Sequence, residues 1–461
     1  MPAEAKKQIE NDLTQGKVLT KLLGFALPYM ASNLIQSFYS IADVLIVGRL
    51  CGTISMSGVV IGSQVTFILT TAAAGFCMGG TVVIGRHFGA GNHSSVDKAS
   101  ATLITLFTVL ALVITPLLLI FRAPLLELIH TPAESFSETS RYFTATVAGI
   151  IFIFGYNVLA SIIRGMGNSK QPFYFVLIAC ILSIFLDFLF EAVFKLRALG
   201  AAMSTVISQA FSVYLCIRYL KKRKFSFDFK LHSFKIDWKE LKFLVKFGLP
   251  ACIQNSIISL SFMFISATVN YIGGVSASAG VGAVLKFRRF VSLPVISIGT
   301  SISTMCAQNF GANLPERAKE ACKYGIIFSV CISYVIFILV QIFPISFLKL
   351  FGNDPSMIRD GAIYMRTYSY DLLIFPLTYC FNSYLIGKGH TLFALINSLF
   401  SSILLRAPAS YFFGITLDLG LYGVGLGNPV ASAWVLLAIY IFLRKDKWDR
   451  SNPRYEQDIV L

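Results

Sequence analysis

The sequence predicts an all-α protein that crosses a membrane many times. Two observations lead to this prediction. Of the 461 residues, 56% are hydrophobic and only 13% are charged, whereas soluble domains average about 45–50% apolar and about 25% charged residues. The apolar stretches are also long and continuous. This pattern is typical of transmembrane helices and not of the alternating strands of a barrel.

Twelve apolar stretches are long enough to cross a bilayer, which takes about 20 helical residues. They are predicted at 21–47, 54–84, 98–121, 139–162, 171–193, 199–219, 243–270, 275–307, 319–345, 360–386, 391–414 and 423–443. Lys and Arg concentrate in the N-terminal segment, the even-numbered connections and the C-terminal tail. By the positive-inside rule, both termini are expected in the cytoplasm and the protein in the cell membrane.

Three blocks of sequence recur at one offset of 222 positions. FALP (25–28) returns as FGLP (247–250), HFGAGN (87–92) as NFGANL (309–314), and Gly165 and Gly167 as Gly387 and Gly389. RALGAAMS (197–204) corresponds to GLYGVGLG (420–427) with a shift of one residue. One repeat unit holds six spans, an even number, so the two halves are expected to have the same orientation in the membrane.

This repeat predicts two six-helix lobes. The N-lobe is expected at 21–220 and the C-lobe at 243–445, joined by a basic cytoplasmic loop at 221–242. Segments 1–20 and 446–461 are expected to be cytoplasmic. Two similar lobes around a cleft suit a transporter that works by alternating access.

Several other classes of protein are disfavoured. The net charge of +16 follows the topology, so contact with anionic lipid is expected and binding of nucleic acid is not. The nine cysteines show no CxxC or Cys/His spacing and are interpreted as small helix residues. There is no metal cluster or nucleophile pattern, so no enzyme is predicted, and no Walker loop, so no ATP-driven pump.

The order and spacing of the motifs resemble the multidrug and toxic compound extrusion (MATE) family. The motifs are the Leu-Pro that opens each half, IADVLIVGRL (41–50), the FGAGN and FGANL pair, RGMGNSKQP (164–172) and LGAAMSTVISQ (199–209). The resemblance covers residues 15–445. It implies export of organic cations, drugs or amphipathic metabolites in exchange for protons or sodium ions, with no cofactor. Acidic residues concentrated in the N-lobe make the chain most similar to the DinF-like bacterial and archaeal branch.

Two carboxylates lie inside the predicted spans of the N-lobe. Asp43 lies roughly 33 Å along the first span from Lys21, and Asp187 lies roughly 24 Å along the fifth from Gln171, if both helices are straight. Both are therefore expected in the outer half of the membrane. A charged residue there costs about 2.5–3.5 kcal/mol on insertion scales, so a function is expected of it. The alternative is that both only form hydrogen bonds between helices.

The resemblance assigns these positions to a coupling site for protons or cations. The site comprises Asp43, Asp187, Tyr142 and Thr205, with Ser183 in place of the usual Asn four residues before the fifth-span Asp. A hydroxyl lacks the second hydrogen-bonding arm of an amide. Burial and a neighbouring carboxylate both favour the protonated form, so we expect protonation to rearrange the N-lobe and expel the cargo. A sodium ion at Asp43 and Asp187 is the one metal site considered.

Other polar residues within or beside the spans have two interpretations each. Glu191 is predicted at the outer interface, near Lys195 and Arg197. Asp371 is expected either to contact substrate or to pair with a base such as Arg366. Four amides, which either contact cargo or form hydrogen bonds between helices, complete the cleft candidates: Asn33, Asn157, Asn255 and Asn382.

The eighth span contains three basic residues in LKFRRF, Lys286, Arg288 and Arg289. They either line the cleft and favour anionic or zwitterionic cargo, or one balances Asp371, or they extend to the outer interface. The first possibility also suits the rival function, a flippase for lipid-linked oligosaccharide or another lipid. The expected partners are a small-molecule cargo and membrane lipid. A two-lobed chain needs no protein partner to enclose a path, so a monomer is expected.

Overall fold

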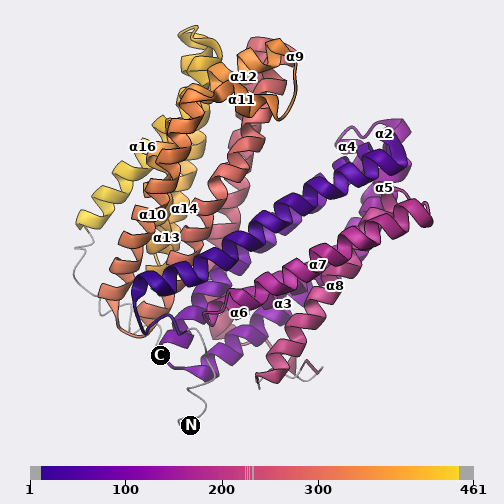
Figure 1. Ribbon diagram of the computed structural model, residues 1–461. Helices are drawn as coiled ribbons and strands as arrows, with labels where there is room; N and C mark the ends of the chain where they lie inside the picture. Colours follow the sequence, from indigo (N-terminus) through magenta and orange to yellow (C-terminus); the bar gives the residue numbers. More distant parts are fainter. Residues whose placement is uncertain (1–11, 224, 226, 228, 231–232, 446–461) are drawn as a thin grey trace. The chain divides into compact units, whose positions relative to one another are not determined.

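The computed structural model describes residues 12–445 except 224, 226, 228 and 231–232 (Figure 1). Parts of the predicted terminal segments (1–11 and 446–461) and those five positions of the basic loop lie outside the described residues. The chain divides into two compact units, Met1–Ser256 and Ile257–Leu461, and each is described by itself. Every regular element in the described part of the chain is a helix.

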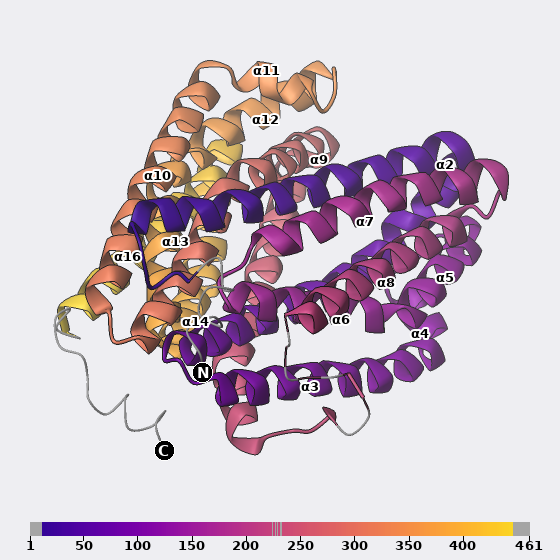
Figure 2. The same cartoon turned by 60° about the horizontal axis from the view of Figure 1, so that its bottom comes forward.

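The first unit contains the helices of the first half of the chain. They are α2 (Val18–Gly89), α3 (His93–Ile120), α4 (Arg122–Leu128), α5 (Ala133–Ala148), α6 (Ile150–Gly165), α7 (Lys170–Phe188), the π-helix η1 (Leu189–Val193), α8 (Ala198–Lys222) and the start of α9 (Trp238–Gly311). Helix α2 packs against α5, α6, α7 and α8. Figure 2 shows α7 beside the N-terminal, indigo part of α2.

The second unit contains the rest of α9 and the helices that follow it. They are α10 (Pro315–Ile342), α11 (Pro344–Lys349), α12 (Pro355–Tyr368), α13 (Asp371–Lys388), α14 (Thr391–Leu399), η3 (Phe400–Arg406), α15 (Ala407–Tyr411), η4 (Phe412–Thr416) and α16 (Gly420–Lys445). Asp354 caps α12, because its Oδ1 accepts hydrogen bonds from the backbone N–H groups of Ser356 (2.8 Å) and Met357 (3.0 Å).

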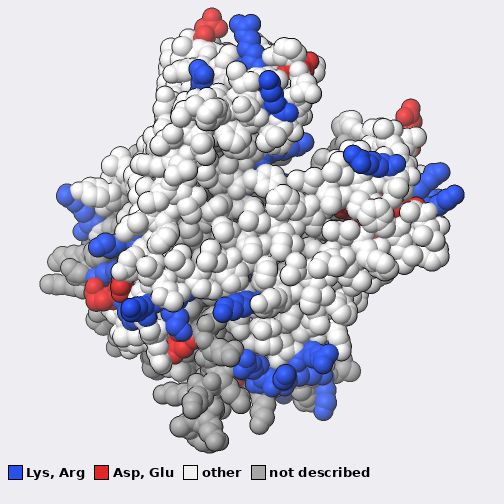
Figure 3. All heavy atoms as spheres, viewed as in Figure 1, with Lys and Arg blue, Asp and Glu red and all other residues white. Residues whose placement is uncertain are grey.

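The predicted spans correspond to these helices. Eight helices of the described residues are long and apolar enough to cross a membrane, or nine if α5 and α6, bent by 48°, form one span. Helices α2 and α9 hold two predicted spans each, and α12 with α13 covers the tenth. Charged side chains on the face shown in Figure 3 gather towards helix ends and are sparse along the helices, as expected for helices in lipid.

The repeat is also visible in the backbone. Helix α2 breaks at Gly52 (φ 82°) and α9 at Gly274 (φ 58°), and these left-handed residues are 222 positions apart. Two further pairs with positive φ have the same spacing: Gly91 with Asn313, and Gly167 with Gly389. Glycine adopts this conformation without a steric penalty, which explains three of these four loop positions and both breaks.

The one-residue shift in the last part of the repeat has a structural explanation. The left-handed residue Lys195 corresponds to Asp418, and η1 to η4, at an offset of 223. Between Gly389, where the offset is 222, and η4 lies η3, a π-helical stretch with no counterpart in α7. A π-turn accommodates one extra residue within a helix. The insertion therefore falls in η3.

Backbones approach closely within the first unit. A Cβ atom added to Gly79 of α2 would lie 2.4 Å from the Cα of Gly248 in α9. Small residues at both positions let these two helices touch, which is how membrane helices commonly gain van der Waals contact. A buried polar contact links the same two helices, since His87 Nε2 lies at hydrogen-bond distance, 3.0 Å, from Glu240 Oε2.

Candidate functional site

Three buried carboxylates meet in the first unit. Asp43 of α2, Asp187 of α7 and Glu191 of η1 place carboxylate oxygens within 4.8 Å of one another. Their exposed fractions are 8%, 0% and 2%. Asp43 Oδ1, Asp187 Oδ2 and Glu191 Oε1 are buried without a hydrogen-bond partner. Among the described residues, no Lys or Arg forms an ion pair with them.

Glu191 corrects one prediction. It does not lie at an interface beside Lys195 and Arg197 but completes the carboxylate cluster. It follows Asp187 by four residues, a spacing that puts both side chains on one face of a helix. Arg197 instead lies 3.8 Å, Nη1 to Oε1, from Glu138. The spacing was a usable signal, but nearby basic residues suggested an interfacial role.

Ser204 and Tyr39 form hydrogen bonds at and beside the cluster. The Ser204 hydroxyl of α8 donates to Asp187 Oδ1. Tyr39 Oη accepts a hydrogen bond from Ser183 Oγ at 2.7 Å and lies 3.0 Å from Thr205 Oγ1. The two predicted residues Ser183 and Thr205 therefore converge on a tyrosine that links α2, α7 and α8. Tyr39 precedes Asp43 by four residues, so the same helix-face spacing could have indicated it.

Tyr142 lies in the packed core beside this site. It belongs to an apolar cluster with Val47, Val59, Ala198, Ala201 and Ala202. A Cβ atom at Gly62 would lie 2.6 Å from Tyr142 Cδ1, so the tyrosine ring packs directly on α2. The structure places this ring near the cluster's helices, and its part in coupling stays a prediction.

The second half of the chain has no equivalent carboxylates. At the offset of 222, Asp43 corresponds to Ile265, which is fully buried in an apolar core. At the offset of 223 that holds after η3, Asp187 corresponds to Ser410. The duplication therefore preserved the helices and not the acidic site.

Asp371 is the first residue of α13 and is buried in the second unit. Its Oδ1 accepts a hydrogen bond from Ser432 Oγ at 2.5 Å. No ion pair joins it to Arg366 in the described part of the chain, and the Arg366 carbonyl accepts from Gln341 Nε2 at 2.9 Å. A pair with Arg366 is therefore not supported, whereas another base, Arg406, interacts electrostatically with Asp371.

The basic run of the eighth span separates into two groups. Lys286 and Arg289 are exposed, whereas Arg288 is half-buried with its guanidinium 4.1 Å from the centre of the Phe262 ring. Residues two apart on a helix point in nearly opposite directions, which explains why Lys286 and Arg288 differ. Arg406 of η3 also lies over Phe262, at 5.1 Å, and the sequence did not indicate it.

The predicted amides do not gather with the carboxylates. Asn157 Nδ2 donates to the carbonyl of Ile153 within α6 at 2.8 Å. Asn255 lies against α2, since its Nδ2 would be 2.9 Å from a Cβ at Gly75. Asn33 is half-buried on α2, and Asn382 is half-buried on α13 in the second unit. Contact of these amides with cargo stays a prediction.

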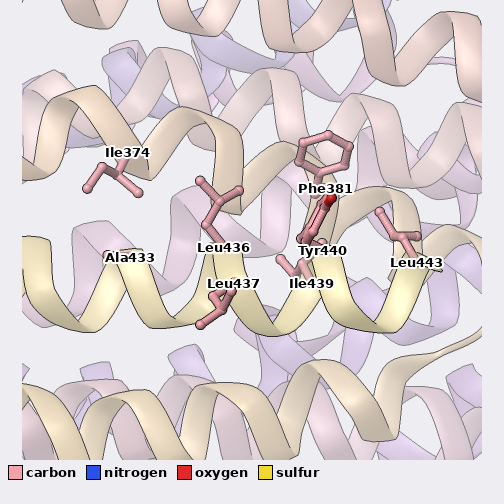
Figure 4. A pocket seen from close by; sticks show the side chains of 8 residues that line it. All are labelled: Ile374, Phe381, Ala433, Leu436, Leu437, Ile439, Tyr440 and Leu443. Carbon is pink, nitrogen blue, oxygen red and sulfur yellow. The ribbon is translucent and has the colours of Figure 1, made fainter. Parts of the chain in front are cut away.

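An apolar pocket of about 470 Å³ lies between α13 and α16 in the second unit (Figure 4). Its lining is Ile374, Phe381, Ala433, Leu436, Leu437, Ile439, Tyr440 and Leu443. The lining has no charged side chain, and none of the predicted site residues belongs to it. The pocket suits an apolar ligand, and its lining provides no charged group that could bind a coupling ion.

The family model described as MatE matches residues 28–189 and again residues 250–412. The chain belongs to the MATE family. Its two matches begin 222 positions apart, as the repeat predicted. The probable multidrug resistance protein YpnP of Bacillus subtilis is 27% identical, over 95% of this chain and 97% of its own length. The FAD transporter of Shewanella oneidensis is 25% identical, over 92% and 94%.

A solved structure described as a MATE in complex with MaL6 superposes with a TM-score of 0.88 at 21% identity, covering 97% of this chain and 98% of that one. This likeness confirms the predicted fold class, helices in two lobes built from a repeat. The family consists of membrane transporters, which argues against an enzyme and does not favour the flippase alternative. Assignment to the DinF-like branch stays a prediction.

Proposed function

We propose that this MATE transporter is a secondary antiporter that exports organic cations, drugs or amphipathic metabolites in exchange for protons or sodium ions. The observation that carries the proposal is the cluster of Asp43, Asp187 and Glu191. The relatives support small-molecule cargo, since one is described as a multidrug resistance protein and another as a FAD transporter.

Electrostatics make the cluster a cation site. Two full charges 4.8 Å apart repel by about 3 kcal/mol at an effective dielectric constant of ~20. Buried carboxylate oxygens without hydrogen-bond donors add a desolvation cost. Protons or a hard cation with oxygen ligands relieve both costs. One monovalent ion leaves two of three negative charges, so full neutralisation requires more than one cation.

The hydrogen bonds around the cluster connect cation binding to movement of helices. The three carboxylates come from α2, α7 and η1, and Tyr39 of α2 bridges Ser183 of α7 and Thr205 of α8. A bound cation holds these helices together, because without it the carboxylates repel one another. Loading from the outside therefore favours one packing of the N-lobe, and release to the cytoplasm favours another, which is the requirement for alternating access.

The orientation follows from the charge distribution of the sequence. The proposal places both termini in the cytoplasm, the cluster in the outer half of the cell membrane, and the lobes at 21–220 and 243–445. A single chain encloses the path, so the working form is a monomer.

The test is export of a fluorescent organic cation from proteoliposomes driven by a pH gradient or by a sodium gradient. We expect one gradient to drive export by wild type, and export to fall at least tenfold in Asp43→Asn and Asp187→Asn. Glu134→Gln, an exposed carboxylate of α5, is the matched control and should transport normally. Near-normal transport by both Asn variants would refute the coupling site, and absence of export by wild type under either gradient would refute the cargo class.

A further inference from the structure

Two arginines from different helices share one aromatic ring in the second unit. The guanidinium carbon of Arg288 in α9 lies 4.1 Å from the centre of Phe262, and that of Arg406 in η3 lies 5.1 Å from it. Each stacking contact is worth about 0.5–2 kcal/mol. Two like charges this close together also repel, so the ring alone does not account for the arrangement.

Two donor atoms of Arg406 have no hydrogen-bond partner. Its Nε and Nη1 are buried and have no hydrogen-bond partner. Leaving a buried donor unpaired costs about 1–3 kcal/mol, and more for a charged group. A guanidinium presents such donors in a planar fork that matches a carboxylate or a phosphate.

One acid nearby offsets part of the positive charge. Asp371 interacts electrostatically with Arg406, but within the described residues it forms no ion pair with either arginine. Its Oδ1 accepts a hydrogen bond from Ser432. Two guanidinium groups and one carboxylate leave one net positive charge. The site is therefore complementary to an anion.

Aromatic rings form the rest of the surroundings. Tyr368 lies 5.7 Å from the Arg288 guanidinium, and its ring stacks on Tyr364 with centroids 5.7 Å apart. Residue Ser261 of α9 donates to the carbonyl of Ser402, at 2.9 Å, which attaches η3 to α9 beside Phe262. The π-helical turn η3, an insertion relative to the first half, thus presents Arg406 towards Arg288. Such turns often occur at functional sites.

We propose that Arg288 and Arg406 bind the anionic group, phosphate or carboxylate, of an aromatic cargo molecule within the second unit. The proposal rests on the proposed transport function and narrows its cargo to anionic or zwitterionic amphiphiles. Lys286 and Arg289, on the exposed side of α9, do not contribute to this site.

The test is equilibrium binding of two probes that differ only in a phosphate, riboflavin and riboflavin 5′-phosphate, to the purified full chain in neutral detergent. Flavin fluorescence reports binding without any ion gradient. Wild type should bind the phosphate form at least tenfold more tightly, since a charge-assisted hydrogen bond contributes about that much. Arg288→Gln and Arg406→Gln should each lose this preference and leave riboflavin binding within about twofold.

Arg444→Gln is the matched control, because Arg444 also stacks on an aromatic ring, 4.7 Å from Tyr440, at the end of α16. It should bind both probes as wild type does. Thermal unfolding of each variant identifies any that fail to fold, and Arg406→Lys, which keeps the charge, should retain part of the preference. Equal affinity of wild type for the two probes, or an undiminished preference in both Gln variants, would overturn the proposal.

A second experiment, displacement of the phosphate probe by a lipid, identifies the source of the anion. Phosphatidylglycerol that displaces the phosphate probe from wild type supports the same site and identifies a lipid headgroup as a ligand, whereas no displacement supports a soluble cargo. Probe binding is measured without an ion gradient, so failure of the coupling proposal in the transport assay is distinguishable from failure of this one.

Discussion

Replacing Glu191 by Gln tests the carboxylate cluster most directly. The change removes one of three buried negative charges and keeps the shape of the side chain. With oxygens within 4.8 Å, each pairwise interaction is about 3 kcal/mol at an effective dielectric constant of ~20. The attraction of the site for a coupling cation should fall by about this amount, which is roughly 100-fold in affinity.

The assay is dye export from proteoliposomes over a range of concentrations of the coupling cation. Glu191→Gln should need roughly 100-fold more cation for half-maximal export, with a similar maximal rate if Asp43 and Asp187 still accept the cation. Glu191→Asp should lie between this variant and wild type, and Glu134→Gln should match wild type. If Asp187→Asn is inactive in this assay but Glu191→Gln has the same cation dependence as wild type, the reasoning is refuted.

Three further changes test one hydrogen bond of the cluster, one close contact between helices and one helix cap. Ser204→Ala removes the hydroxyl that donates to a cluster carboxylate and should change cation affinity by about fivefold in the same assay. Ser208→Ala removes a buried hydroxyl without a hydrogen-bond partner and should leave cation affinity unchanged. Gly79→Ala should lower the melting temperature in detergent by several degrees because its Cβ meets backbone, whereas Gly24→Ala has open space and should not. Hydrogen bonds from Ser356 and Met357 hold the pKa of the Asp354 carboxyl below its ordinary range. Asp354→Ala should therefore lower the melting temperature at pH 7, and the difference from wild type should fade as the pH falls below about 4.

Most of the fold could be predicted from local patterns in the sequence. Apolar runs of about 20 residues indicate spans regardless of what packs on them. The glycine pairs Gly165 with Gly387 and Gly167 with Gly389 helped to identify the repeat, and the structure adds a pair at the same spacing, since Gly52 and Gly274 adopt left-handed conformations at the helix breaks. The repeat followed from the same pattern.

The candidate site was predictable only in part. Asp43 and Asp187 stand out because a charge in an apolar run is costly, and this cost can be read without coordinates. Tyr39 and Ser204 do not stand out, because tyrosine and serine occur in membrane helices for many reasons. Glu191 was misplaced because its position near the outer end of the span, close to Lys195 and Arg197, suggested an interface.

The sequence by itself determined that the chain lies in a membrane, and it determined the number of spans, the duplication and the two intramembrane aspartates. Each of these depends on residue type and spacing along the chain. Only the tertiary structure decided which side chains meet. The direction in which Glu191 and Arg406 point depends on π-helical turns and on the neighbouring helices, and a one-residue change of register rotates a side chain by about 100°. This rotation separates a residue that faces lipid from one that joins a buried charged cluster.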